Sequence, residues 1–396
     1  KKNHYSTDMK KTILSLLILF STYAHAETGD SIALRTIYSE VLSNAKAYEW
    51  LRELSNDIGG RLSGSPEAAK AVEWTRKKLI EAGADTVWLQ EVWVPHWVRG
   101  ARESAKIIDA QGFAQEVPVC ALGGSVATAT SGITAQVVEV NDFKQLEKLG
   151  ADAIKGKIVF FNHPFDPKFI NTFNAYGEAV EYRWKGPSMA AKYGAVASIV
   201  RSMTLSQDDH PHTGSMHYAD TLAKIPCCAI STNGADLLSR IIRANSETKF
   251  FLKMSCESKD SVLSYNVIGD IRGSEFPGEV IVAGGHLDSW DTGDGAHDDG
   301  AGIVQSIEII RTLKALGWKP KRTIRMVAFM NEENGTKGGK KYAAYAKTSG
   351  EKHIAAIESD AGGFVPFGIG LEMSEDKKAL VRRWAPLFRP YNIWNF

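Results

Sequence analysis

Hydrophobic positions in the last third of the chain switch repeatedly between the period of a strand and the period of a helix. Short apolar runs predict strands, and apolar residues that recur every three or four positions predict helices. The predicted strands are 264–271, 279–285, 323–330 and 353–358, and the predicted helices are 299–316 and 340–347. Strands that alternate with helices are typical of an α/β fold, with a mainly parallel mixed sheet covered by helices on both faces.

The first part of the chain has a helical pattern from residue 30 to residue 85, followed by an alternating strand pattern over 86–94. Ser65 can cap a helix that begins at Pro66, because proline suits the first turn. Gly83 is the predicted end of that helix.

Residues 112–257 are predicted to form a smaller inserted domain. A stretch rich in glycine, serine, threonine and alanine leads into a new series of short strands and helices, such as the strand 133–140. We therefore expect a main domain formed by residues 27–111 and 258–396, interrupted by this insert.

Residues 9–26 have the pattern of a secretory signal peptide. Met9 and two lysines precede an apolar run over 13–23, and Ala24-His25-Ala26 is typical of a cleavage site. The alternative is a membrane anchor, but the run is too short to cross about 30 Å of hydrocarbon as a helix. We expect cleavage after Ala26, export to the periplasm or medium, and no membrane anchor.

Composition narrows the possible partners and the redox chemistry. The 396 residues carry a net charge of +1, which favours neither nucleic acid nor an anionic membrane surface as a partner. An exported protein can form disulfides, but buried free thiols are an equally good interpretation of the four cysteines. These are Cys120, Cys227, Cys228 and Cys256.

Histidine and carboxylate residues follow several of the predicted strands. Because the carboxyl ends of parallel strands meet at one crevice, these side chains are expected to converge. His286, Asp288 and Asp298 come after the strand 279–285, Glu332 and Glu333 after 323–330, and Asp360 after 353–358. Taken singly, each has an ordinary alternative, such as a helix cap or a solvated turn.

Together, these residues predict a metal centre. Converging carboxylates repel one another, and a divalent cation removes that repulsion. Histidine and carboxylates without thiolate suit catalytic zinc, and several carboxylates in one site suit two metal ions.

These stretches resemble the zinc exopeptidase family that includes bacterial secreted aminopeptidases and glutamate carboxypeptidases. The resemblance extends from Gly60-Arg61 and Gly64-Ser65-Pro66, through Pro211-His212-Thr213-Gly214, to about Asn392. The insert is similar to the protease-associated domain of several members. The resemblance implies a two-zinc hydrolase that acts on small peptides, as a dipeptidase, a carboxypeptidase or an aminopeptidase.

The resemblance also implies the metal ligands, one position at a time. His286 and Asp360 match ligands of one metal, Asp298 matches the bridging aspartate, and Glu333 matches a ligand of the other metal. Family members carry one more histidine ligand beyond the position that matches Asn392. We therefore expect the second metal site to be impaired in this chain.

Two further positions match residues that act beside the metals. Glu332 matches the general base that acts on the attacking water, and Asp288 matches the aspartate that supports the first histidine. Two alternatives stay open: a catalytically impaired binding relative, and a glutaminyl cyclase-like acyl transferase. The preferred side chain and the oligomeric state, including a homodimer, also stay open.

Overall fold

The computed structural model describes residues 29–396, so the predicted signal peptide lies outside the described residues. The chain divides into two compact units. The larger unit consists of Ala47–Lys314 and Trp318–Gly362, and the described part of the smaller unit consists of 29–46, Ala315–Gly317 and Gly363–Phe396. Within residues 29–396, no helix is long and apolar enough to cross a membrane.

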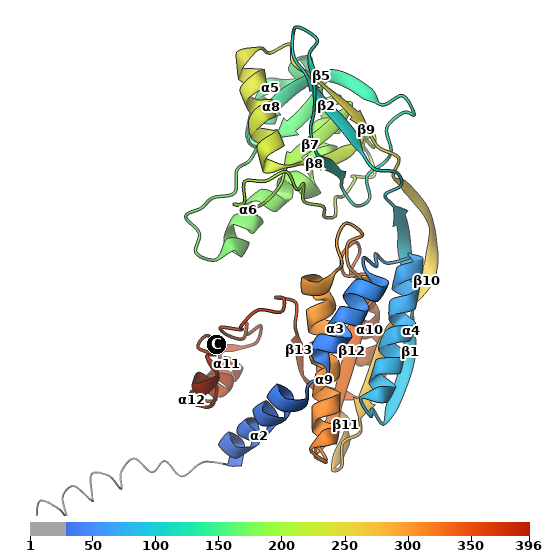
Figure 1. Cartoon of the computed structure of the whole chain (residues 1–396), viewed down its shortest axis with the longest axis vertical. Helices are drawn as coiled ribbons and strands as arrows, with labels where there is room; N and C mark the ends of the chain where they lie inside the picture. The colour runs from blue at the N-terminus through green and yellow to red at the C-terminus, as the bar shows by residue number, and fades with distance from the viewer. Residues whose placement is uncertain (1–28) are drawn as a thin grey trace, which may run out of the picture. The chain divides into compact units, whose positions relative to one another are not determined.

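A five-stranded mixed sheet forms the centre of the larger unit (Figure 1). Its strands, in spatial order, are β1 (Thr86–Val98), β10 (Glu257–Ile271), β12 (Arg322–Phe329), β11 (Phe276–His286) and β13 (Lys352–Glu358). Strand β10 is antiparallel to both of its neighbours, whereas β12, β11 and β13 are parallel. The predicted mixed sheet is confirmed, and its three consecutive parallel strands end at the same edge.

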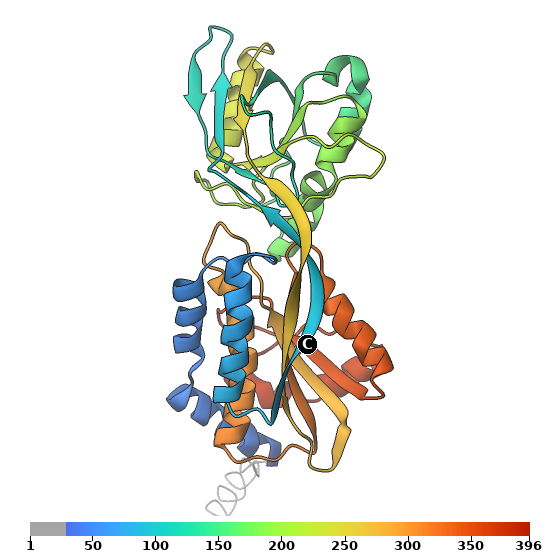
Figure 2. The same ribbon diagram turned by 90° about the vertical axis from the view of Figure 1, so that its right-hand side faces the viewer.

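Helices cover both faces of this sheet, as predicted. Along a strand, successive side chains point to opposite faces. Val267 and Met326 therefore pack with helices α3 (Ala47–Arg52), α4 (Pro66–Glu81) and α9 (Ala301–Ala315). The next residues, Ile268 and Val327, pack on the other face with Tyr342 of helix α10 (Lys337–Thr348). Figure 2 shows α4 and α9 on one side of the sheet and α10 on the other.

The beginning of α4 agrees with its sequence signal. The Ser65 hydroxyl accepts a hydrogen bond from the Ala68 N–H at 3.0 Å, and Pro66 is the first helical residue. The helical pattern predicted before α4 is divided in the structure: α3 is followed by the π-helical turn η1 (Glu53–Ile58), which ends before Gly59.

The insert is built on an eight-stranded sheet. Its strands are β2 (Ser104–Ile108), β3 (Ala114–Glu116), β4 (Val119–Ala121), β5 (Ile133–Val140), β6 (Ile158–Phe161), β7 (Ala197–Arg201), β8 (Cys227–Ile230) and β9 (Lys249–Lys253). Its helices are α5 (Phe143–Ile154), α6 (Thr172–Trp184), α7 (Gly186–Lys192) and α8 (Thr232–Ala244). Strands β1 and β10 pair beyond the main sheet and carry the chain into and out of the insert.

The start of the insert corrects the predicted boundary at residue 112. Strand β2 pairs with β9 in the sheet of the insert, so the insert begins before Ser104. The sequence signal at 112 was a turn inside the insert, between β2 and β3. All four cysteines of the insert are buried and free, so the structure contains no disulfide between them.

The smaller unit joins the two ends of the described chain. It contains helix α2 (Gly29–Asn44) with α11 (Glu375–Arg382), α12 (Ala385–Phe388) and the short 3-10 helix η3 (Arg389–Tyr391). The rings of Tyr38 and Tyr391 stack with centroids 3.7 Å apart. The predicted main domain included these two terminal segments, whereas in the structure they form a separate unit.

Candidate metal centre

The predicted ligands converge at the shared edge of the three parallel strands. His286 is the last residue of β11, Glu332 and Glu333 follow β12, and Asp360 follows β13. Asp298 lies in the segment that leads into α9. Ligand atoms of His286, Asp298 and Asp360 all lie within 4.8 Å of one another.

The two ring nitrogens of His286 have different partners: Nδ1 binds a backbone carbonyl, and Nε2 faces the carboxylates of the site. Its Nδ1 lies 2.8 Å from the carbonyl oxygen of Asp288, and because a carbonyl only accepts, this nitrogen carries the proton. Its Nε2 lies 3.0 Å from Asp298 Oδ1 and 3.4 Å from Asp360 Oδ1. The ring is 1 % exposed, so Nε2 is held facing the carboxylates.

The same carboxylates change the protonation of His286 in the absence of metal. Burial disfavours the imidazolium, but the hydrogen bonds to Asp298 and Asp360 outweigh burial and raise the pKa of His286 to about 12. A positive charge is therefore favoured at the position where the ligand atoms meet, which is the electrostatic condition for a cation site.

The side chain of Asp288 supports a different residue from the one predicted. Its Oδ1 accepts a hydrogen bond from the Glu332 N–H at 3.0 Å, whereas His286 is bound by the carbonyl of Asp288 and not by its carboxylate. Asp288 is completely buried, and burial raises the pKa of its carboxyl. This residue therefore links the loop after β11 to the loop after β12.

Two buried carboxylate oxygens are left without a hydrogen-bond donor in the described part of the chain, Oδ2 of Asp288 and Oε1 of Glu333. Burial and then the charges of Asp298 and Asp288 raise the pKa of Glu333 to about 9. A buried anion without a donor is costly unless a cation or a proton compensates it. Together with the three converging ligands, this donor set fits a divalent metal with oxygen and imidazole ligands, such as zinc.

Asp299 is a site residue that the sequence analysis did not single out. Its Oδ2 accepts from the His286 N–H at 3.0 Å, and its Oδ1 accepts from the Gly302 N–H at 2.9 Å. Burial raises the pKa of Asp299 to about 8. A Cβ added to Gly285 would lie 2.3 Å from Asp299 Oδ2, so only glycine allows this close approach. Asp299 thus ties the end of β11 to the start of α9.

Arg61 is a second residue of this kind, and it is completely buried. Its guanidinium donates to the carbonyls of Leu287 at 2.6 Å and Gly295 at 2.9 Å, and also to those of Asp294 and Gly59. Burial lowers the pKa of Arg61 to about 10, while the charges of nearby carboxylates oppose that change. Arg61 therefore holds both ends of the loop between His286 and Asp298.

The loop that carries Glu332 and Glu333 is framed by three polar side chains. The Asn331 amide donates to Ser63 Oγ at 2.8 Å and also to Asn334 Oδ1, and the Ser63 hydroxyl donates to Asn334 at 2.8 Å. Asn331 is completely buried and has a positive φ of 70°, which turns the chain sharply at the end of β12.

Three other histidines, His297, His210 and His212, lie outside the group of converging ligand atoms. His297 is exposed, and its ring packs against the backbone of Gly362. His210 and His212 are exposed residues of the insert loop. None of the three belongs to the group of ligand atoms found in residues 29–396.

Comparisons with known proteins identify relatives over most of the chain. The sequence profile of Peptidase family M28 matches residues 266–392. Carboxypeptidase Q of Bos taurus is 36% identical over 369 residues, which are 93% of this chain and 75% of that protein. The human carboxypeptidase Q is 37% identical over 348 residues, which are 88% of this chain and 71% of that protein.

Solved structures agree with this relationship. The Peptidase M28 precursor from Shewanella amazonensis SB2B superimposes with a TM-score of 0.87 at 33% identity, covering 92% of this chain and 82% of that one. BSAP, a zinc aminopeptidase from Bacillus subtilis, has a TM-score of 0.61 at 20% identity, covering 88% of this chain and 83% of that one. The second likeness concerns the fold alone.

Proposed function

The chain belongs to Peptidase family M28 and is a metallo-exopeptidase by that membership, and from this premise we propose a zinc-dependent enzyme of small peptides. Its substrates are dipeptides or the terminal residues of short peptides. The observation that carries the proposal is the buried Nε2 of His286, which faces Asp298 at 3.0 Å and Asp360 at 3.4 Å. Imidazole nitrogen and carboxylate oxygen are both zinc ligands, and three protein ligands leave a position open for water, as catalytic zinc requires.

The proposed ligands are divided between two metal positions. His286, Asp298 and Asp360 would hold one zinc, and Asp298 together with Glu333 would hold a second. The donorless oxygen of Glu333 supports this second position. Two carboxylates bind zinc less tightly than a set that contains imidazole. We therefore expect the second metal to be the weaker one.

Zinc bound here supplies Lewis acidity, which acidifies water and polarises a peptide carbonyl. The chain itself supplies the proton transfers. Glu332, whose N–H is fixed by Asp288, accepts the proton of the attacking water and returns it to the leaving amine. Burial raises the pKa of Glu332, which brings this carboxylate closer to the range where it can both accept and donate a proton.

The test is Glu332→Gln, assayed on a panel of free, N-blocked and C-blocked dipeptides. Turnover should fall about 10²- to 10⁴-fold, the usual contribution of general acid–base catalysis, while the zinc content stays unchanged. Glu351→Gln is a control of the same chemistry, because Glu351 lies just before β13, at the opposite end of that strand from Asp360, and pairs with Arg325. Near-normal turnover in Glu332→Gln would remove Glu332 from the role, and absence of metal from the unchanged protein would refute the zinc enzyme.

The proposed location is the periplasm or the medium, because residues 9–26 have the pattern of a signal peptide. Protein recovered from an exported fraction should begin at Glu27. Exported protein that still carried the apolar run 13–23 would contradict this assignment.

A further inference from the structure

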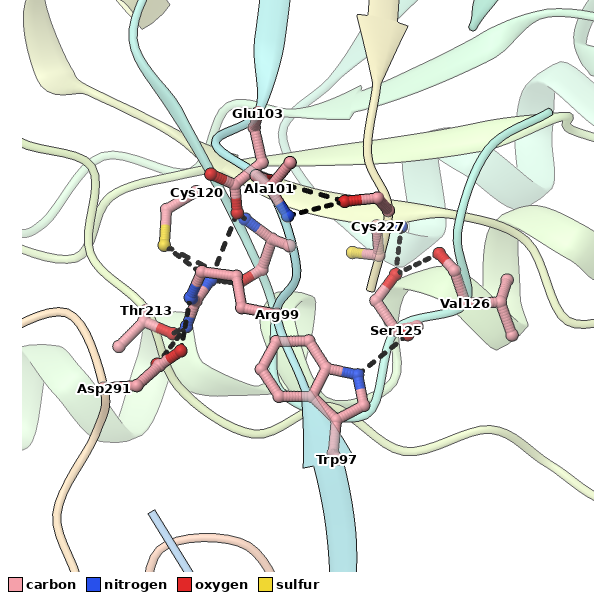
Figure 3. Close-up of polar contacts among 12 residues, drawn as sticks. Trp97, Arg99, Ala101, Glu103, Cys120, Ser125, Val126, Thr213, Cys227 and Asp291 are labelled. Atoms are coloured by element: carbon pink, nitrogen blue, oxygen red, sulfur yellow. Dashed lines mark hydrogen bonds and ion pairs between the residues drawn. The ribbon is translucent and has the colours of Figure 1, made fainter. Parts of the chain in front are cut away.

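The side chain of Arg99 lies just past the end of β1, where the chain enters the insert (Figure 3). It is 12% exposed and makes a two-pronged ion pair, with Nη2 2.7 Å from Asp291 Oδ1 and Nε 2.9 Å from Asp291 Oδ2. Its Nη2 also donates to the Thr213 hydroxyl at 3.1 Å, and its Nη1 to the Ala121 carbonyl at 2.6 Å. One guanidinium therefore joins the insert to a loop of the main domain.

The first partner, Asp291, lies in the loop between two proposed ligands, His286 and Asp298. The neighbouring Trp290 packs against the core of the insert. A Cβ added to Gly123 would lie 2.0 Å from the Trp290 ring, so the indole fits directly against that backbone. The tip of the loop is thus held by the insert, while Arg61 holds its two ends.

The second partner, Thr213, lies in an insert segment that reaches the other metal-binding loop. The hydroxyl of Ser215 donates to the carbonyl of Glu333. The same segment is held by Arg183, whose Nε donates to the Ser215 carbonyl at 3.2 Å, and by a hydrogen bond from the Gly123 N–H to the Gly214 carbonyl at 2.9 Å. Thr213 is only two residues from Ser215, which binds the backbone of Glu333, so a shift of Thr213 should also move Glu333.

We propose that Arg99 is a positioning residue that sets the distance between Asp298 and Glu333, the two carboxylates proposed to hold the second zinc. Asp298 has a side chain that is 63% exposed, so its place depends on the loop that carries it. His286 is the last residue of β11 and Asp360 lies just after β13, so the strands themselves place these two ligands. The insert would then be a working part of the metal centre, and the inference rests on the proposed zinc chemistry.

The test is Arg99→Lys, which keeps the charge but cannot form the two-pronged contact with Asp291. Partners of metal ligands typically contribute 10- to 100-fold to metal affinity, so the zinc dissociation constant should rise by about that factor. In the metal-free protein, amide hydrogen exchange should become faster in 288–300 and 331–335 but not in 353–360. Arg201→Lys is the matched control, because Arg201 is also buried in the insert and pairs with Asp236 at 2.6 Å without touching either loop.

Asp291→Asn, alone and combined with Arg99→Lys, tests whether the pair acts as a unit. The double variant should lose no more zinc affinity than Arg99→Lys alone, because each change breaks the same contact. Unchanged zinc affinity and unchanged exchange in both loops of Arg99→Lys would overturn the inference. So would an equal effect of Arg201→Lys. An unchanged protein that binds no zinc would instead refute the proposed function, so the two failures are distinguishable.

Discussion

Replacing Arg61 by methionine should destabilise the protein because it removes the donor that holds four carbonyls. Arg61 is completely buried, and the Leu287 carbonyl at 2.6 Å has no other donor among residues 29–396, whereas the Gly295 carbonyl at 2.9 Å also accepts from the Gly300 N–H at 3.0 Å. Methionine has a similar length but no hydrogen-bond donor. The perturbation is therefore mainly a loss of hydrogen bonds and of one positive charge.

The size of the effect follows from these contacts. The Leu287 carbonyl left without a donor costs about 1–3 kcal/mol, and the lost charged hydrogen bond to the Gly295 carbonyl costs about 1.5–3 kcal/mol, so the two together cost roughly 2.5–6 kcal/mol. Part of this is offset because methionine carries no charge to desolvate, and burial already lowers the pKa of Arg61 to about 10. We expect a net loss of about 3 kcal/mol in the free energy of unfolding, near the lower end of values for breaking buried charged contacts.

Zinc should reduce this loss. The positive charge of Arg61 interacts favourably with Asp288, Asp299 and other carboxylates of the centre, and a bound cation replaces part of that interaction. Urea unfolding followed by tryptophan fluorescence, with and without zinc, measures both quantities. Arg201→Met is the control, because its loss should not depend on zinc. An Arg61→Met protein within about 0.5 kcal/mol of the unchanged one, the range of an ordinary surface substitution, would refute this reasoning.

Three further predictions concern Asp299, Glu351 and the zinc content. Asp299→Asn should weaken zinc binding about tenfold and lower stability by about 2 kcal/mol, because its amide NH₂ would face the N–H of His286 or Gly302, and titration with zinc checks it. Glu351→Gln should cost about 1–2 kcal/mol at neutral pH, because Glu351 loses charged hydrogen bonds to Arg325. Burial raises the pKa of Glu351, but the hydrogen bonds from Arg325 outweigh burial and hold the pKa below 4.5. The stability difference between the two proteins should therefore shrink as the pH falls below 4.5, which urea unfolding at a series of pH values measures. Elemental analysis after dialysis of the 27–396 protein should find about one tightly held zinc per chain, since among the described residues only one of the two proposed sites includes an imidazole ligand.

Elements with a clear period were predictable, and elements defined by long-range pairing were not. The helix from Pro66 had a capping serine before it and a glycine after it, and the strand 133–140 had apolar residues at alternate positions from Ile133 to Val137, so local chemistry decided both. Strand β2 is only five residues long and depends on pairing with β9, far away in the sequence. Nothing local in 104–108 marks it as part of the insert.

The metal ligands could be predicted from their positions after strands, whereas the residues that hold the ligand loops could not, because their contacts are far away in the sequence. His286 and Asp360 follow predicted strands directly, so the sheet topology brings these two together, and Asp298 lies in the segment between the first of these strands and α9. Arg61 acts through carbonyls that are more than two hundred positions away, and an arginine beside glycines carries no sequence signal for such contacts. The prediction for Asp288 had the right neighbourhood but the wrong partner, because only the structure shows that its carboxylate faces the Glu332 N–H.

The charge balance of the centre explains why these supports and the metal belong together. Arg61 and His286 are the cations that act on a group of carboxylates, whose pKa values burial raises in Asp288, Asp299 and Glu333. Without metal, protons compensate the excess negative charge. A bound zinc must displace those protons, so metal affinity, proton release and local order are linked. Arg61 and Asp299 bind backbone carbonyls and N–H groups of the loops that carry the ligands, so we expect these two residues to hold the ligands near one another whether protons or a metal compensate the charge.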